Sequence, residues 1–226
     1  PFNQDIRMDE LVGKIRSVQP EAIVVDRAVP KKNQNYLTPE NTVPDKMLPY
    51  PWESCIILGG GWSYSFNATM MPSRKLIHML SDIVAKGGNL LLNIGPGPDG
   101  TWYEEAYSRL DDMGEWLKIN GEAIYATRVL EPYSEGKLRF THGKDGSDYI
   151  IYLLDENENI PAEIVTEKYS PEKGSKINVL GKKTVPLKWQ TTGGKFKIMI
   201  PENIRKSLPS PYAVTLKISK TPVKIL

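Results

Sequence analysis

The sequence predicts an α/β region over residues 1–128 and an antiparallel β-sandwich over residues 129–226. The first prediction rests on residues 86–100, KGGNLLLNIGPGPDG, where a short and almost wholly apolar run lies between glycine-rich turns. Such a run is typical of a strand that is buried on both faces of a parallel sheet. The second prediction rests on a series of short strand-like runs, separated by turn sequences, in the C-terminal part of the chain.

Helix-like and strand-like segments alternate over the first region. Apolar residues recur at helical spacing in residues 6–18, 72–86 and 106–120, whereas strand-like runs occupy residues 22–25, 53–58 and 89–94. Three βα units of this kind form part of a (β/α)8 barrel or of an open doubly wound sheet. Three parallel strands alone would leave unpaired edges, so we expect further strands upstream of Pro1 in the natural polypeptide.

The pattern changes after the helix that closes at Asn120. Strand-like runs then occupy residues 137–142, 149–154, 164–167, 176–180, 185–189, 196–200 and 213–218. Turn sequences separate them, among them Lys144-Asp145-Gly146 and Gly193-Gly194. We therefore expect a second, all-β domain that begins near Val129.

The composition is that of an ordinary globular chain. The 226 residues include 29 basic and 27 acidic side chains, so no charge excess favours nucleic acid or an anionic membrane as a partner. No apolar run approaches the ~18 residues that a membrane-spanning helix needs. The single cysteine, Cys55, excludes an intramolecular disulfide, and its place within a strand is typical of a small buried apolar residue.

Several common kinds of site do not fit. Residues 95–100, GPGPDG, match the spacing G-x-G-x-x-G of dinucleotide sites, but the two prolines lack the N–H groups that a pyrophosphate needs, and two glutamates follow at the helix start. The histidines, His78 and His142, lie away from any expected nucleophile, so each is interpreted as a packed or surface residue. No spacing of His, Cys, Asp or Glu indicates a metal site.

Polar and aromatic residues gather instead where the expected strands end. Residues 28–51 contain five prolines and predict a long loop at the carboxyl rim of the strands. The residues expected at this rim are Asp26, Arg27, Glu40, Trp52, Glu53, Trp62, Tyr64 and Asp99. Paired carboxylates beside aromatic rings suit glycoside hydrolysis, in which one carboxyl protonates the leaving oxygen and the other attacks or activates water. By residue type alone, structural ion pairs and core packing explain the same residues.

Five blocks of the sequence resemble, in order, the C-terminal half of the catalytic domain of glycoside hydrolase family 29, the retaining α-L-fucosidases. The blocks are VVDR, YLTPEN, YPWESC, VAKGGNLLLNIGPGPDGT and GEWLKINGEAIYATR. The resemblance extends from about Ile6 to Arg128, and the region behind it is similar in kind to the family's C-terminal β domain. It implies the second half of a (β/α)8-like barrel followed by a β-sandwich. It also implies an exo-acting enzyme that removes terminal α-linked L-fucose through a covalent fucosyl-enzyme intermediate, without a cofactor.

The resemblance assigns roles to three residues. Arg27 of VVDR resembles the arginine that binds the sugar at a strand end, and Glu40 of TPEN matches the glutamate that acts as general acid/base. Trp62, after the glycines 59–61, corresponds to an aromatic residue beside the apolar side of fucose. The nucleophilic aspartate and the fucose-binding histidines of the family lie upstream of this chain, so neither is assigned here.

Position separates the two candidate acids. Glu53 begins an expected strand and so lies toward the amino end of the barrel, whereas Glu40 lies in the rim loop, where catalytic groups of such barrels are found. The resemblance further implies a fucosylated glycan as substrate, an upstream half-barrel as partner, and export to a periplasmic, secreted or lysosomal location. We expect the chain alone to be inactive. The alternative is a carbohydrate-binding fragment without any activity.

Overall fold

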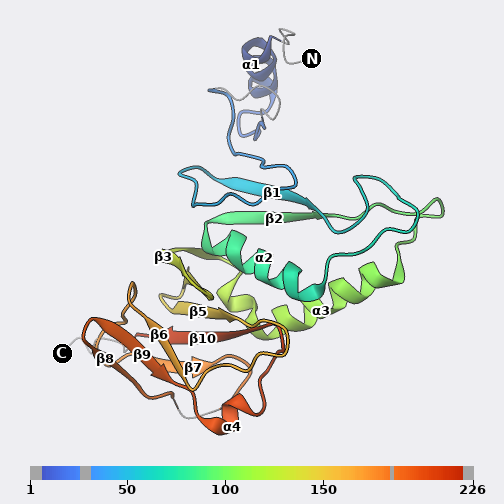
Figure 1. Ribbon diagram of the computed structural model, residues 1–226. Helices are drawn as coiled ribbons and strands as arrows, with labels where there is room; N and C mark the ends of the chain where they lie inside the picture. Colours follow the sequence, from blue (N-terminus) through green and yellow to red (C-terminus); the bar gives the residue numbers. More distant parts are fainter. Residues whose placement is uncertain (1–6, 26–31, 184–185, 221–226) are drawn as a thin grey trace.

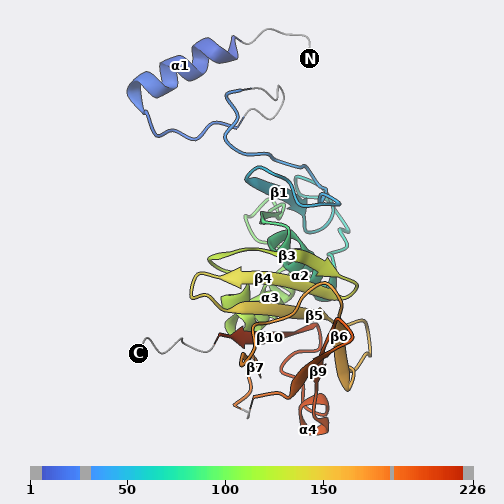
Figure 2. The same ribbon diagram turned by 90° about the vertical axis from the view of Figure 1, so that its left-hand side faces the viewer.

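The structure is a computed structural model that describes residues 7–25, 32–183 and 186–220 (Figure 1). Its α/β part contains helix α1 (Met8–Val18), strand β1 (Trp52–Ile57), helix α2 (Ser73–Ala85), strand β2 (Gly88–Asn93) and helix α3 (Glu104–Asn120). These elements confirm the three predicted helices and two of the three predicted strands. Figures 1 and 2 show α1 at the far end of the molecule, away from the other helices.

Strands β1 and β2 form a parallel pair, as predicted. Their register begins with Trp52 opposite Gly88, and the buried Trp52 ring lies so close that a Cβ on Gly88 would come within 2.4 Å of it. The Trp52 side chain is 1% exposed and its Nε1 donates a hydrogen bond to the Lys86 carbonyl. The expectation that Trp52 lies at the rim is therefore wrong, because its ring packs in the core at the amino end of the sheet.

A segment that was predicted to be loop pairs with the free edge of β1. Cys55 donates its N–H to the Pro39 carbonyl at 3.1 Å, and Asn41 donates its N–H to the Cys55 carbonyl at 2.7 Å. Glu53 likewise donates to the Leu37 carbonyl at 3.0 Å. Residues 37–41 thus run parallel to β1 as a short third strand.

The strand predicted at residues 22–25 does not form. Both backbone groups of Val24 are bonded to Asn35, whose N–H reaches the Val24 carbonyl at 2.9 Å and whose Oδ1 accepts from the Val24 N–H at 2.8 Å. The backbone of Val24 is therefore satisfied locally, and residues 37–41 occupy the edge of β1 where this strand would have paired.

The C-terminal part is an antiparallel β-sandwich, as predicted. A five-stranded sheet in the order β3-β4-β5-β10-β7 faces a three-stranded sheet in the order β6-β9-β8. The strands are β3 (Thr127–Glu135), β4 (Leu138–Gly143), β5 (Asp148–Leu153), β6 (Glu163–Thr166), β7 (Lys176–Val179), β8 (Trp189–Thr192), β9 (Lys195–Met199) and β10 (Ala213–Ser219), with the short helix α4 (Glu202–Arg205) before the last. The run predicted at 185–189 is displaced to β8, and β3 was not predicted.

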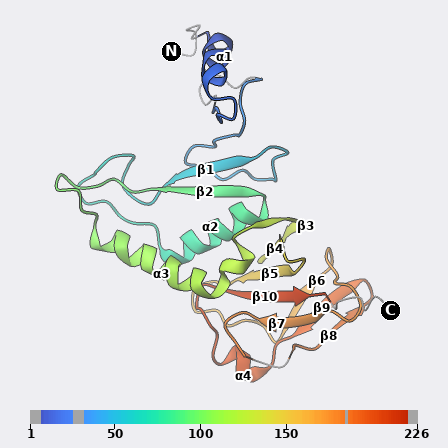
Figure 3. The same ribbon diagram turned by 180° about the vertical axis from the view of Figure 1, so that it is seen from behind.

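The five-stranded sheet is covered on both of its faces. Along β5, Ile150 packs into the core between the two sheets of the sandwich, whereas Ile151 packs into a second core with α2 and α3. β10 divides in the same way, with Leu216 in the first core and Ala213 in the second. This alternation follows from the two-residue period of a strand. Figure 3 shows α2 and α3 lying between the β1–β2 pair and this sheet.

One face of the β1–β2 pair is uncovered in the described part of the chain. We call it the open face, and it is formed by Glu53, Cys55, Ile57, Asn89, Leu91 and Asn93. Leu91 lies in the middle of β2 and is 48% exposed. The prediction that this strand is buried on both faces is therefore wrong here, because α2 covers one face and no described element covers the other. Cys55, expected to be buried, is only partly so.

Candidate active site

Two loops follow the carboxyl ends of β1 and β2, and together they form the rim of this structure. Residues 58–72 and 94–103 pack so closely that a Cβ on Gly95 would lie 2.5 Å from the Ser63 carbonyl carbon. Asn93 donates from Nδ2 to the Trp62 carbonyl at 3.2 Å, and the Tyr103 hydroxyl donates to the Ser65 carbonyl at 2.8 Å. The rim is therefore one connected surface rather than two independent loops.

Trp62 lies on this rim, as predicted. It follows three consecutive glycines, of which Gly60 has a φ of +72° that a side chain would disfavour. The Trp62 side chain is 43% exposed, while its carbonyl is held by Asn93 of β2. The backbone is thus fixed, and the ring is available to contact a ligand.

Glu40 lies beside β1 and not in a rim loop. It is exposed and its backbone is paired, in parallel, with Cys55 near the middle of the strand. Residues opposite one another in a parallel pair point to the same side of the sheet, so Glu40 shares the side of Cys55 and Glu53. The structure therefore brings Glu40 and Glu53 to the open face, the side from which a barrel interior would be lined.

Of the other residues expected at the rim, two lie outside the described part of the chain and two lie at the rim. Arg27 and Asp26 lie outside the described residues. Tyr64 and Asp99 meet at the rim, where both line a hollow between the two loops. The hydroxyl and N–H of Thr101 donate to Asp99 Oδ1 and hold the pKa of that carboxyl below its usual value.

The rim also holds aromatic residues that the sequence analysis did not single out. Tyr64 stacks on Tyr103 with ring centroids 5.6 Å apart and planes inclined by 4°, and Phe66 meets the Tyr64 ring edge to face at 5.3 Å. Trp102 packs at 5.4 Å against Tyr107 from the first turn of α3. Their position after the carboxyl end of a parallel strand was the signal that could have identified them.

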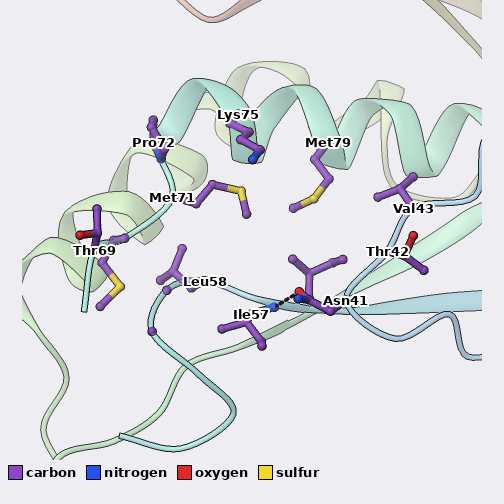
Figure 4. A pocket seen from close by; sticks show the side chains of 14 residues that line it. Asn41, Thr42, Val43, Ile57, Leu58, Thr69, Met71, Pro72, Lys75 and Met79 are labelled. Atoms are coloured by element: carbon purple, nitrogen blue, oxygen red, sulfur yellow. Dashed lines mark hydrogen bonds between the residues drawn. The ribbon is translucent and has the colours of Figure 1, made fainter. Parts of the chain in front are cut away.

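A larger pocket of about 580 Å³ lies on the other side of β1 (Figure 4). Met79 and Lys75 of α2 line one wall, and Asn41 and Thr42 line another, where the Asn41 Oδ1 accepts the backbone N–H of Ile57 at 3.3 Å. Neither Glu40 nor Trp62 is among its lining residues. Several of its other lining residues belong to the 58–72 loop, so the pocket lies where that loop meets α2 and β1, and it contains none of the predicted catalytic or sugar-binding residues that the structure describes.

The described ranges contain neither a metal-binding cluster nor a membrane-spanning helix. No three His, Cys, Asp or Glu side chains lie close enough together there to hold a metal ion. No helix of that part of the chain is both long and apolar enough to cross a bilayer.

Comparisons with known proteins agree with the resemblance. The sequence model of the family described as alpha-L-fucosidase matches residues 1–122, which is more than half of the chain. The chain therefore belongs to the alpha-L-fucosidase family. The alpha-L-fucosidase of Branchiostoma floridae is 31% identical over 182 residues, covering 77% of this chain and 39% of that protein. The plasma alpha-L-fucosidase of Homo sapiens is 42% identical over 90 residues, covering 38% of this chain and 19% of that protein.

Solved structures of the same family share the fold. The crystal structure of Thermotoga maritima alpha-fucosidase in complex with a mechanism-based inhibitor superimposes with a TM-score of 0.77 at 28% identity. The superposition covers 95% of this chain and 49% of that chain. An alpha-L-fucosidase GH29 from Bacteroides thetaiotaomicron is similar in fold alone, with a TM-score of 0.74 at 19% identity, covering 93% of this chain and 51% of that chain. The chain thus spans about half the length of the structures that it matches.

Proposed function

We propose that this chain supplies the general acid/base and part of the sugar-binding surface of a retaining exo-α-L-fucosidase. The observation that carries the proposal is the position of Glu40, an exposed residue on the open-face side of a parallel sheet, in a chain of the alpha-L-fucosidase family. The upstream half of a (β/α)8-like barrel completes the site, either in the same polypeptide or in a second one. The open face is the surface that this half would cover.

The reaction needs two carboxyl groups on opposite sides of the glycosidic bond. In the proposed mechanism an aspartate of the upstream half attacks the anomeric carbon of fucose, and Glu40 donates its proton to the departing glycosidic oxygen. The ionised Glu40 then removes a proton from water, which attacks the anomeric carbon and releases fucose with retained configuration. The two groups of a retaining enzyme stand about 5–5.5 Å apart.

Two further residues bind the sugar in this proposal. The exposed ring of Trp62 lies beside the apolar face of fucose, including its methyl group, and contributes apolar contact. The Arg27 guanidinium donates hydrogen bonds to sugar hydroxyls or to the nucleophile. The substrate is a glycan or glycoconjugate with a terminal α-linked fucose. Because relatives of this chain include plasma enzymes, we also propose that it acts outside the cytosol.

The role of Glu40 is tested by leaving-group dependence in the complete enzyme. Glu40→Ala should slow hydrolysis of fucosyl disaccharides, which have poor leaving groups, by about 100-fold or more, because protonation of the leaving oxygen is lost. Activated aryl fucosides should be affected far less, and added azide should restore their turnover by attacking the fucosyl intermediate. Rates on both substrate types, with and without azide, are the measurement.

Glu53→Ala is the matched control, since Glu53 lies on the same open face but toward the start of β1. It should show neither the leaving-group dependence nor the rescue by azide. If Glu53→Ala shows both and Glu40→Ala behaves like the wild type, the assignment of the acid/base is wrong. A complete enzyme that turns over no fucoside at all would favour the alternative, a carbohydrate-binding protein without activity.

A further inference from the structure

We propose that the rim carries a second sugar subsite, which binds the neutral pyranose ring to which fucose is attached. The subsite is a hollow of about 280 Å³, called here the aromatic hollow. Its lining residues are Tyr64, Gly97, Pro98, Asp99, Thr101, Trp102 and Tyr103. This inference rests on the proposed function, because it extends the same site from fucose to the next sugar of the glycan.

Position is the first argument. Tyr64 is two residues beyond Trp62 in the loop after β1, and Trp102 and Tyr103 come from the loop after β2. The two loops are joined by the close packing of Gly95 on Ser63 and by the Tyr103 hydroxyl bond to Ser65. A glycan whose fucose contacts Trp62 would therefore extend over the neighbouring part of the same rim.

The chemistry of the walls is the second argument. Trp102 and the stacked pair of Tyr64 and Tyr103 give the hollow aromatic walls, and aromatic rings suit the apolar C–H face of a pyranose. Asp99 supplies an acceptor, since both bonds from Thr101 go to Oδ1 and Oδ2 has no partner within the described chain. Apolar walls with a few fixed polar groups are the usual composition of a small-molecule site.

The occupant should be a single neutral sugar. A volume of about 280 Å³ is slightly below the range of about 300–1,000 Å³ typical of ligand pockets, so it accommodates one ring rather than an oligosaccharide. An ionised Asp99, with Glu104 and Glu105 in the first turn of α3 nearby in the sequence, would repel a uronic or sialic acid. Neutral hexose and N-acetylhexosamine rings fit both conditions.

The aromatic hollow is preorganised by backbone hydrogen bonds. Gly97 donates its N–H to the Thr101 carbonyl at 2.7 Å, and Gly100 donates to the Gly97 carbonyl at 2.9 Å, so residues 97–101 form a tight turn. A Cβ on Gly97 would lie 3.1 Å from Asp99 Oδ1, which leaves little room for a side chain there. A fixed turn of this kind reduces the entropy that binding would otherwise cost.

Kinetics on two kinds of substrate test the subsite in the complete enzyme. The first is the best of a panel of α1,2-, α1,3-, α1,4- and α1,6-linked fucosyl disaccharides, and the second is α-L-fucosyl fluoride, whose leaving group is too small to enter the hollow. Trp102→Ala and Asp99→Asn should each lower kcat/KM for the disaccharide by about tenfold and leave the fluoride within about twofold. Equal losses on both substrates, or no loss on the disaccharide, would overturn the subsite.

Tyr125→Ala is the matched control, because Tyr125 is an exposed aromatic residue beyond the opposite end of α3, which is about 25 Å long. It should leave both rates unchanged. A second measurement does not depend on activity: saturation-transfer NMR with lactose and N-acetyllactosamine should detect binding to the wild type and to Tyr125→Ala but not to Trp102→Ala. Absence of saturation transfer to the wild type would refute the subsite even if fucosides are hydrolysed. Its presence without any fucoside turnover would refute the proposed function alone.

Discussion

At the residue scale, the charge of His78, at the contact between the α/β part and the sandwich, depends on pH. His78 of α2 is half-buried, and its Nε2 lies 2.9 Å from the Tyr212 carbonyl. Burial lowers the pKa of His78, with Arg74 and Arg139 acting in the same direction and the Tyr212 carbonyl and Asp155 opposing them. Its charged form is therefore disfavoured in the folded state.

This shift predicts a loss of stability in mild acid. Since the pKa of His78 is lower in the folded than in the unfolded chain, the unfolded state binds the extra proton. The contribution of His78 to the free energy of unfolding is fully present above its pKa in the unfolded chain, about 6.5. It is lost as the pH falls through the lower pKa that His78 has in the folded chain. Melting temperatures measured between about pH 7.5 and pH 5 should fall more steeply for the wild type than for His78→Gln. Parallel curves for the two proteins would contradict the prediction.

For single residues, the sequence predicted the position of Trp62 but not that of Glu40. Periodicity and neighbouring glycines were sufficient to place Trp62 at the rim, because they depend on the chain within a few residues. Glu40 was expected in a loop. Its backbone partner, Cys55, is fifteen positions away, and no local sequence pattern indicates that the two residues pair. The roles of Glu40 and Arg27 came from resemblance and not from any physical pattern of the sequence.

At the scale of elements, a partly buried network of charges joins three parts of the fold. Asp82 of α2 accepts from Lys86 Nζ at 2.6 Å on one side and from Arg139 Nε of β4 at 2.5 Å on the other. Lys86 Nζ also donates to the Pro44 carbonyl at 2.8 Å, and its side chain is only 9% exposed. The network therefore ties the sandwich, through α2, to the chain that continues from Glu40.

Removing the Lys86 charge tests how much this network of charges contributes to stability. Lys86→Met leaves Asp82 paired with Arg139 but abolishes two charge-assisted hydrogen bonds, so unfolding in urea should show a loss of about 1–3 kcal/mol. The matched control is Lys118→Met, which breaks an exposed pair with Glu115 and should lower the stability far less, because exposed ion pairs contribute little. Equal losses in the two variants would mean that the Lys86 contacts contribute no more than a surface pair.

Elements with a strong local pattern were predicted well, and elements defined by their partners were not. Helices α1, α2 and α3 followed from their apolar stripes, and six of the sandwich strands from short apolar runs between turns. The strand at residues 22–25 failed because the Val24 backbone is bonded to Asn35, a competition that hydrophobic pattern does not reveal. Strand β3 contains Pro132 and an irregular register, so it lacks the alternation that would have identified it.

At the scale of the whole molecule, the open face predicts that these 226 residues alone do not hydrolyse fucosides. Within the described part no element covers Leu91 and its neighbours, and retention needs a second carboxyl group opposite Glu40. Purified chain should leave α-L-fucosyl fluoride and an aryl fucoside unhydrolysed above the buffer rate. Turnover by the lone chain would show that the site is complete without an upstream half.

Cys55 reports on the same face, because it is the chain's single cysteine and is partly exposed there. A thiol reagent should label it in the lone chain, and the upstream half, when present, should slow the labelling. Equal labelling in both preparations would mean that this half does not cover the open face.

The five-stranded sheet has a consequence for how the chain comes apart. Its side chains alternate between two cores, so neither core can be lost without exposing one entire surface of the same strands to water. Such a shared wall makes unfolding of the α/β part and of the sandwich a single cooperative event. A protease that cut the connection at Ala126 would leave a nicked molecule whose two pieces stay together, because the buried surface, and not the peptide bond, joins them.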